Sequence, residues 1–254
     1  RISLAYVIMI ILIWIPMARR KSLAFLDVGQ GDCFVADTKS GAIIFDGGSS
    51  SEDQVGRYRI LPYMKYLGYQ KIQIAVISHM DIDHYSGIRE LLEMGKIKYL
   101  GLPEIPKDET MKKIIGIAKK RGTTIFYLSR GRQITTKDGS LKVLHPQKNS
   151  QMEKNAASLV MQGKILGYRV LLTGDVEKEG EEELLSEELE RADILKAAHH
   201  GSKNSTSNEF LQKVQPKQTV ISCGKQNRYG HPHLETIHRL QTYRTKIYRT
   251  DRSG

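Results

Sequence analysis

Residues 74–84 read Ile-Ala-Val-Ile-Ser-His-Met-Asp-Ile-Asp-His, and this stretch decides the fold. Its first four side chains are apolar and predict a buried strand. Four candidate ligands follow within six positions at the end of that strand: His79, Asp81, Asp83 and His84. Imidazoles and carboxylates are common ligands of divalent metal ions in proteins. The stretch therefore predicts a metal cage at a sheet edge, and it indicates hydrolysis by a metal-activated water.

The spacing of these ligands predicts two metal ions. Alternate side chains of an extended segment point the same way. We therefore expect His79 and Asp81 to bind one ion. Asp83 and His84 are expected to turn toward a second ion. The alternative is a polar loop whose side chains only cap neighbouring elements.

Two later strands end in further candidate ligands. Residues 171–175 read Leu-Leu-Thr-Gly-Asp, an apolar strand that ends in a carboxylate. Asp175 is expected to bridge the two ions, or else to cap the acidic helix that follows, since Asp suits that position. Residues 194–202 read Ile-Leu-Lys-Ala-Ala-His-His-Gly-Ser, a strand that runs into two imidazoles. His199 and His200 are both candidate metal ligands, and the sequence leaves open which one binds.

Other polar residues are expected to face a substrate at the same edge. These substrate-binding candidates are Asn155, Ser158, Ser202, His231 and His233. The last two fall within a Tyr-Gly-His-Pro-His segment, where they either orient the substrate or only shape a turn. His231 is also expected to help the leaving oxygen depart. Together with the metal ligand Asp83, it completes the predicted catalytic set.

The composition favours an anionic partner. The chain has 254 residues, of which 39 are Lys or Arg and 28 are Asp or Glu, so its net charge is +11. Such a surface suits nucleic acid, an anionic membrane face or a phosphorylated substrate, although it can also serve solubility alone. Only 7% of the residues are aromatic, so sequence-specific reading of bases is not indicated. The two cysteines, Cys33 and Cys223, are expected to be small buried residues that bind no metal.

Two segments stand out by composition. Residues 2–18 contain no charge, and Arg1 and residues 19–21 flank them with positive charge. This pattern favours the end of a transmembrane helix at residues 1–21, with a signal peptide as the alternative, followed by a hydrolase domain at 22–254. Residues 177–190 carry eight glutamates and predict a helix with a solvent-exposed acidic face.

The order of these motifs resembles the metallo-β-lactamase superfamily, whose signature is His-x-His-x-Asp-His. More narrowly, it is similar to the C-terminal domain of the ComEC competence proteins, which carry DNA across the bacterial membrane. The matching segments are residues 25–32 (Phe-Leu-Asp-Val-Gly-Gln-Gly-Asp), 46–48 (Asp-Gly-Gly), 78–87, 155–160 (Asn-Ala-Ala-Ser-Leu-Val), 173–175 (Thr-Gly-Asp), 195–207 and 229–233. The fold that this resemblance implies is an α/β protein, an αββα sandwich with the metals at one sheet edge.

The sequence departs from the superfamily signature at two positions. Asp81 stands at the second histidine, and Asn155 stands at the usual third histidine of the first metal site. Both changes replace nitrogen ligands by oxygen, which favours Mn²⁺. We therefore expect two divalent ions, Mn²⁺ first, with Zn²⁺ or Mg²⁺ as alternatives, and no small organic cofactor.

The resemblance implies a metal-dependent nuclease that belongs to a membrane channel for DNA uptake. It would grip DNA non-specifically through the phosphates and degrade the strand that is not imported. Its place would be the bacterial cell membrane, on a side that the sequence leaves open. Two alternatives remain at this stage: a membrane-anchored hydrolase of another phosphodiester, and a DNA-binding module with a vestigial metal site.

Overall fold

Two sheets lie face to face in the computed structural model, which describes residues 21–152, 155–187 and 189–253. The first sheet has six strands in the order β1 (Leu23–Phe25), β2 (Phe34–Thr38), β3 (Gly41–Phe45), β4 (Ile72–Val76), β5 (Ile97–Pro103) and β6 (Thr124–Leu128). Strands β1 to β3 are antiparallel, and β3 to β6 are parallel. The parallel part puts the carboxyl ends of β3 and β4 at one edge of the sheet.

The second sheet has seven strands and is also mixed. Its order is β13 (Lys246–Arg249), β12 (Gln218–Ile221), β11 (Ile194–Lys196), β10 (Tyr168–Leu172), β9 (Val160–Ile165), β8 (Gly139–His145) and β7 (Gln133–Thr136). Strands β7 to β10 are antiparallel, and β10 to β13 are parallel. The carboxyl ends of β10 and β11 therefore also lie side by side, as a ligand site at the ends of parallel strands requires.

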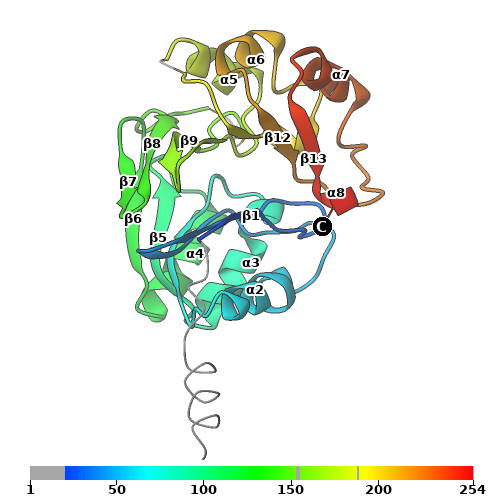
Figure 1. Cartoon of the computed structure of the whole chain (residues 1–254). Coiled ribbons are helices and arrows are strands. Elements are labelled where there is room, and N and C mark those ends of the chain that lie inside the picture. Colours follow the sequence, from blue (N-terminus) through cyan, green and yellow to red (C-terminus); the bar gives the residue numbers. More distant parts are fainter. Residues whose placement is uncertain (1–20, 153–154, 188, 254) are drawn as a thin grey trace, which may run out of the picture.

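Helices cover the outer face of each sheet (Figure 1). The first sheet is covered by η1 (Gly56–Ile60), α2 (Leu61–Tyr66), α3 (Ile82–Glu93) and α4 (Glu109–Lys120). The second is covered by α5 (Lys178–Leu185), α6 (Asn208–Val214) and α7 (Leu234–Thr242). Two short elements, η2 (Ala198–Gly201) and α8 (Thr250–Ser253), complete the described part of the chain.

Three apolar clusters explain why the layers hold together. Between the sheets, Phe34 and Phe45 of one sheet pack with Met161 and Leu172 of the other. A second cluster lies between the first sheet and its helices, and a third lies between the second sheet and its helices. The parallel strands are thus buried on both faces, which explains their nearly continuous apolar sequences. The predicted αββα sandwich is confirmed for the described residues.

Some expected elements differ in extent. The helix predicted from residue 177 onward ends at Leu185. The helix after the metal loop begins at Ile82, directly after Asp81, whose extended backbone (φ −99°, ψ 148°) stops the preceding segment. The predicted membrane segment at 1–21 lies almost wholly outside the described residues. Among those described, no helix combines the length and apolar character needed to span a bilayer. Cys33 and Cys223 are buried and unpaired, as expected.

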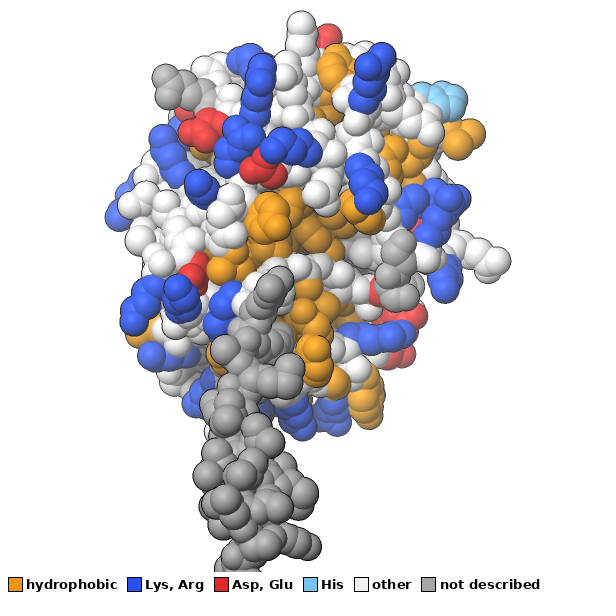
Figure 2. All heavy atoms as spheres, in the orientation of Figure 1, with side chains coloured by type: hydrophobic (Ala, Val, Ile, Leu, Met, Phe, Trp, Pro, Cys, Tyr) orange, Lys and Arg blue, Asp and Glu red, His pale blue; other side chains and the backbone are white. Residues whose placement is uncertain are grey.

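The basic residues do not gather into one stripe on the face drawn in Figure 2. Lys and Arg side chains are scattered around a central apolar area, with few acidic side chains among them. On this face, therefore, the positive charge is spread over the surface. A spread charge attracts phosphates without selecting a sequence.

Candidate metal centre

Four ligands from both halves of the sandwich meet at the edge where the parallel strands end. We call Asp83, His84, Asp175 and His200 the inner corner; each offers a ligand atom within 4.8 Å of the others. Asp175 Oδ2 lies 3.2 Å from His84 Nε2 and 3.3 Å from His200 Nε2. Ligand atoms about 2.1 Å from a shared ion in tetrahedral geometry are roughly 3.4 Å apart. The observed separations match that spacing.

The two inner-corner imidazoles are held by hydrogen bonds at their far nitrogens. Nδ1 of His84 lies 2.9 Å from Oδ2 of Asp46, which is fully buried. Nδ1 of His200 lies 2.9 Å from the carbonyl oxygen of Ser222, an acceptor that requires the ring to donate there. Such partners fix the tautomer of a metal-binding histidine and turn Nε2 toward the ion. Both rings are therefore oriented as ligands.

The donor atoms of the inner corner fit a metal ion. Among the described residues, Nε2 of His84 and Nε2 of His200 are buried without a hydrogen-bond partner. Burial disfavours the charged form of both rings. Asp175, together with Asp46 for His84 and with Asp32 for His200, outweighs this effect and raises the pKa of each histidine well above its usual value. A cation at this point would therefore compete with protons for the same two nitrogens.

Two further predicted ligands of the metal loop, His79 and Asp81, and the predicted substrate-binding residue Asn155 form a looser group, which we call the outer corner. His79 is buried, its Nδ1 lies 3.0 Å from Ser78 Oγ, and its Nε2 lies 3.6 Å from Asp81 Oδ2. The Asp81 side chain is 38% exposed, and Asn155 is half-buried. The pairing of His79 with Asp81 and of Asp83 with His84 agrees with the spacing of the sequence.

His199 and His200 point in different directions. Nδ1 of His199 lies 2.7 Å from Glu177 Oε1, and its Nε2 is 3.8 Å from Asp175 Oδ2. Both histidines have left-handed backbones, with φ of 47° and 52°. Such a conformation costs about 1–3 kcal/mol in a residue other than glycine and is typical of functional sites. It aims the His200 ring at the inner corner and leaves His199 on the rim.

A buried ion pair lies beneath the ligands, and the sequence did not reveal it. The Nζ of Lys196 contacts Asp32 Oδ2, lies 3.4 Å from Asp175 Oδ1 and donates to the Gly174 carbonyl at 2.8 Å. Lys196 is 3% exposed and Asp32 is 4% exposed. Burial opposes the charge of Asp32, but Lys196 and His200 lower the pKa of this carboxyl to about 2. The pair holds the second oxygen of Asp175, so it positions the predicted bridging ligand.

Two glycines let the neighbouring loops approach the metal loop closely. A Cβ on Gly31 would lie 2.2 Å from the Gly48 carbonyl oxygen, and one on Gly48 would lie 2.6 Å from the His84 nitrogen. Backbone hydrogen bonds join the same segments, including Asp32 N–H to the Asp83 carbonyl at 3.0 Å. The Gly-rich motifs at 29–31 and 47–48 are thus required for packing around the site.

The ligands open into a pocket of about 350 Å³. Its wall is formed by residues from several loops, namely Gln30, Asp81, Ile82, Asp83, Asn155, Asp175, His199, His200, Tyr229 and His231. Of the five predicted substrate-binding residues, Asn155 and His231 thus lie on the wall.

The remaining three take supporting positions. Ser158 is fully buried, and its Oγ accepts from the Asp175 N–H at 3.3 Å. Ser202 closes the turn after the histidine pair, where its carbonyl accepts from Thr236 Oγ1 at 2.8 Å. Nδ1 of His233 accepts from the Lys203 N–H at 3.2 Å. Their polar groups are therefore used in holding the loops.

His231 is an uncharged group on the pocket wall. Its ring stacks on that of Tyr229, with centroids 5.7 Å apart, and its Nδ1 is buried without a hydrogen-bond partner in the described part of the chain. Burial and the nearby imidazoles of His199, His200 and His233 lower its pKa to about 4. The ring is therefore neutral at pH 7 and can donate through one nitrogen while accepting through the other.

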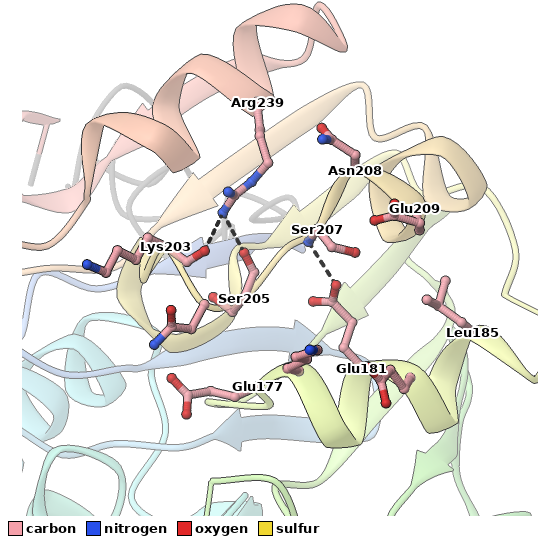
Figure 3. A pocket seen from close by; sticks show the side chains of 12 residues that line it. Glu177, Glu181, Leu185, Lys203, Ser205, Ser207, Asn208, Glu209 and Arg239 are labelled. Carbon is pink, nitrogen blue, oxygen red and sulfur yellow. Dashed lines mark hydrogen bonds between the residues drawn. The ribbon is translucent and has the colours of Figure 1, made fainter.

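A second cavity, of about 720 Å³, lies between α5 and the loop that precedes α6 (Figure 3). Glu181 accepts from the Thr206 N–H at 2.7 Å and from the Ser207 N–H at 2.8 Å. Arg239 donates to the carbonyls of Lys203 and Ser205 (Figure 3). These charged groups are used to brace the loop that follows His200.

The expectation of an exposed acidic face is wrong for one residue of α5. Glu181 is 3% exposed, because the helix turns it inward together with Leu184, which is fully buried. Burial raises the pKa of the Glu181 carboxyl, although two backbone N–H groups stabilise its charged form.

A family model places the chain in a known class. The model of the metallo-β-lactamase superfamily matches residues 26–225, and the chain belongs to this superfamily. Its fold commonly holds two divalent metal ions at the sheet edge that the inner and outer corners occupy here.

Curated relatives of the chain include competence proteins of the ComEC type. The chain is 35% identical over 267 residues to ComE operon protein 3 of Bacillus subtilis, covering 98% of this chain and 34% of that protein. It is 30% identical over 238 residues to competence protein ComA of Neisseria gonorrhoeae, covering 90% and 30%. The chain thus spans about a third of the length of these relatives. The predicted resemblance is confirmed.

Solved structures agree on the fold. The metallo-β-lactamase fold protein YhfI of Bacillus subtilis superposes with a TM-score of 0.59 at 13% identity, covering 90% of this chain and 96% of that one. The diiron β-hydroxylase CmlA of Streptomyces venezuelae superposes with a TM-score of 0.56 at 11% identity, covering 91% and 53%. At such identities the likeness extends to the fold alone.

Proposed function

We propose that this chain is a metal-dependent phosphodiesterase that cleaves DNA. The observation that carries the proposal is the inner corner, where two carboxylates and two oriented imidazoles from separate loops converge on one point. The names of its relatives, which are competence proteins, favour DNA as the substrate. The net charge of +11 is consistent with a polyanion bound through its phosphates.

The chain's own residues divide into metal ligands and supports. Asp83, His84 and His200 would hold one divalent cation. His79 and Asp81 would hold a second, and we propose that Asp175, which lies beside His84 and His200, also reaches this second cation. Bound cations would acidify a water and offset the charge that builds on the phosphoryl oxygens. We favour Mn²⁺ over Zn²⁺ or Mg²⁺, because Asp81 and Asn155 make the outer corner rich in oxygen.

The leaving oxygen requires a proton, which the attacking water carries, and His231 is placed to hydrogen-bond to that oxygen as it departs. Hydrolysis of a diester adds water across one P–O bond and gives a phosphate monoester and an alcohol. The departing oxygen therefore gains a proton. His231 lines the pocket, is neutral at pH 7, and its Nδ1 has no hydrogen-bond partner among the described residues. We assign it the hydrogen bond to that oxygen.

The setting of the activity follows from the relatives and is part of the same proposal. We infer that the domain belongs to a longer membrane protein that takes up DNA, and that it degrades the strand that is not transported. It would then lie at one face of the bacterial membrane, next to the channel portion of the same protein. DNA would be gripped without regard to sequence.

The outer corner favours a second candidate function. Because Asp81 and Asn155 replace two histidines of the superfamily signature, the metal site could be vestigial and the domain could only grip DNA. A hydrolase of another phosphodiester is the remaining enzymatic alternative.

The test compares substrates and a ligand variant. Wild-type protein loaded with Mn²⁺, Zn²⁺ or Mg²⁺ is incubated with linear single-stranded DNA, duplex DNA and the small diester bis(p-nitrophenyl) phosphate. Cleavage of DNA supports the nuclease, whereas turnover of only the small diester favours another substrate. Asp83→Ala should abolish cleavage and leave DNA binding intact.

The matched control is Asp53→Asn, which alters an exposed carboxylate outside the pocket. It should retain full cleavage. An inactive wild type that binds DNA firmly with every metal would contradict the nuclease and support the binding module.

A further inference from the structure

Gln30 carries an unsatisfied hydrogen-bond donor on the wall of the metal pocket. Its side chain is 2% exposed, yet it lines the same pocket as Asp83 and His200. Its Nε2 has no hydrogen-bond partner within the part of the chain that the structure describes. A buried amide donor left without a partner is destabilising. The protein thus keeps an unfavourable group at the place where a substrate would enter.

The orientation of this amide is fixed by its other end. Oε1 of Gln30 accepts a hydrogen bond from the Gly224 N–H at 3.1 Å. Only the oxygen of the amide can accept that bond, so Nε2 is the end of the amide that is left without a partner. A Cβ on Gly224 would lie 2.6 Å from the Gln30 nitrogen, so the close approach depends on glycine.

The backbone of Gln30 is held equally firmly. Its N–H donates to Ser51 Oγ at 2.8 Å, and its carbonyl accepts from the Ser50 N–H at 2.8 Å. The main chain from which the side chain extends is therefore fixed, and Oε1 is fixed at its far end. A donor that is held in place before its ligand arrives loses little entropy when it binds.

We propose that Nε2 of Gln30 donates a hydrogen bond to a non-bridging oxygen of the phosphate group in the metal pocket. This assignment rests on the proposed phosphodiesterase function. The ligand must supply an acceptor, and phosphate oxygens are acceptors. An uncharged donor suits this position, because a Lys or Arg there would repel the cations that Asp83 and Asp175 are proposed to hold.

The first test replaces the donor while keeping the acceptor. Gln30→Glu retains an oxygen for Gly224 and puts a second oxygen where Nε2 was. We expect kcat/KM on single-stranded DNA to fall by about 100-fold, the loss typical of one preorganised donor. Gln241→Glu, which makes the same chemical change on the exposed face of α7, should leave kcat/KM unchanged.

The second test reads the contact itself. Gln30→Met removes the donor without adding charge, and thermal unfolding checks that both variants are folded. Substrates with a single phosphorothioate of defined configuration replace one non-bridging oxygen by sulfur. Wild type should be slowed by sulfur at the position that Gln30 contacts, and Gln30→Met should lose that sensitivity for one configuration only. An unchanged response to both configurations would overturn the assignment.

A third measurement separates this proposal from the proposed function. Inorganic phosphate is titrated calorimetrically into the Mn²⁺-loaded protein, which requires no turnover. Gln30→Glu and Gln30→Met should each bind phosphate about 10-fold more weakly than wild type, with unchanged cation stoichiometry. Equal phosphate affinity in all three proteins would refute the role of Gln30, even if DNA is cleaved. Weakened phosphate binding without any DNA cleavage would uphold Gln30 and refute the nuclease.

Discussion

The inner and outer corners of the metal centre differ in how firmly the fold holds them. At the inner corner, His84 and His200 are buried, and Asp46 and the Ser222 carbonyl fix their far nitrogens. At the outer corner, Asp81 is partly exposed and Asn155 is half-buried. A preformed ligand set binds more tightly, because less order must be created on binding. We therefore expect one tight cation and one weaker, exchangeable cation.

The strongest test of this difference removes an inner ligand. His200→Ala should lower the affinity for the tightly bound cation by at least about 100-fold, since the loss of even a supporting partner of a metal ligand lowers metal affinity by about 10–100-fold. At a cation concentration 100 times the wild-type Kd, bound metal stabilises wild type by about 2.7 kcal/mol, and the variant would gain only about 0.4 kcal/mol. Chemical denaturation with and without Mn²⁺ measures both values.

The control for this variant is His238→Ala, which removes an exposed histidine of α7. It should keep the full stabilisation by metal. If His200→Ala also keeps it, the inner corner is not the tight site, and the comparison fails.

A second test leaves the ligands in place and removes a support. In Asp46→Asn, Oδ1 can still accept from the Ser78 N–H, but an amide would face His84 Nδ1. That ring would then carry its proton on Nε2, where it blocks a cation. Affinity for the tight cation should fall by about 10–100-fold. Isothermal titration measures it, and an unchanged affinity would show that the imidazole needs no such partner.

A third test asks whether the loop after His200 gives the inner corner its rigidity. The Glu181 carboxylate accepts hydrogen bonds from two backbone N–H groups, and Glu181→Gln would place an amide N–H opposite one of them. The free energy of unfolding at pH 7 should fall by about 1–3 kcal/mol. Denaturant unfolding measures it, and a loss below about 0.5 kcal/mol would contradict the bracing role.

The same residue predicts a pH dependence. Because burial raises the folded-state pKa of Glu181 above its unfolded value, the native state takes up its proton first as the pH falls. Wild type should therefore gain stability relative to Glu181→Gln as the pH falls from 7 through the raised pKa to about 4.3, the ordinary value for glutamate. Unfolding curves at pH 7 and pH 5 compare the two proteins, and a constant difference would contradict the shift.

The smallest expected effect concerns the outer corner alone. Asn155→His adds an imidazole where the superfamily signature has one, and nitrogen ligands favour Zn²⁺ over Mn²⁺. The affinity of the outer corner for Zn²⁺, measured as the weaker of the two binding events, should rise by about 10-fold, or about 1.4 kcal/mol. The affinity of the inner corner for its tightly bound cation should stay unchanged. A two-step titration resolves both, and a change in the tight step would show that the corners are not separable.

The inner corner illustrates what the sequence makes predictable. His84, Asp175 and His200 lie in the segments that follow β4, β10 and β11, and the carboxyl ends of parallel strands meet at one edge. Their convergence was therefore expected. The choice between His199 and His200 was not predictable, because it depends on two left-handed backbone conformations that no residue preference indicates.

The supports of the site were harder to foresee. Asp32 and Asp46 stand in Gly-rich turns after apolar segments, and Lys196 is a lone charge within an apolar strand. That lone charge was the available signal, since a buried lysine needs a carboxylate partner. Which carboxylate it meets depends on strand order in the second sheet. Likewise, the inward turn of Glu181 depends on the phase of α5 against its sheet. The strand β7 is hard to foresee from the sequence, because its four residues, Gln133–Thr136, are largely polar.

The origin of the inner-corner ligands has a mechanical consequence. Asp83 and His84 belong to the part of the chain that builds the six-stranded sheet, whereas Asp175 and His200 belong to the part that builds the seven-stranded sheet. A cation shared by both pairs would act as a removable staple across the sandwich. Removal of the cation by a chelator should then weaken the contact between the two sheets. The rate at which a protease cleaves the loops at this sheet edge would report the fraction of metal sites that are occupied.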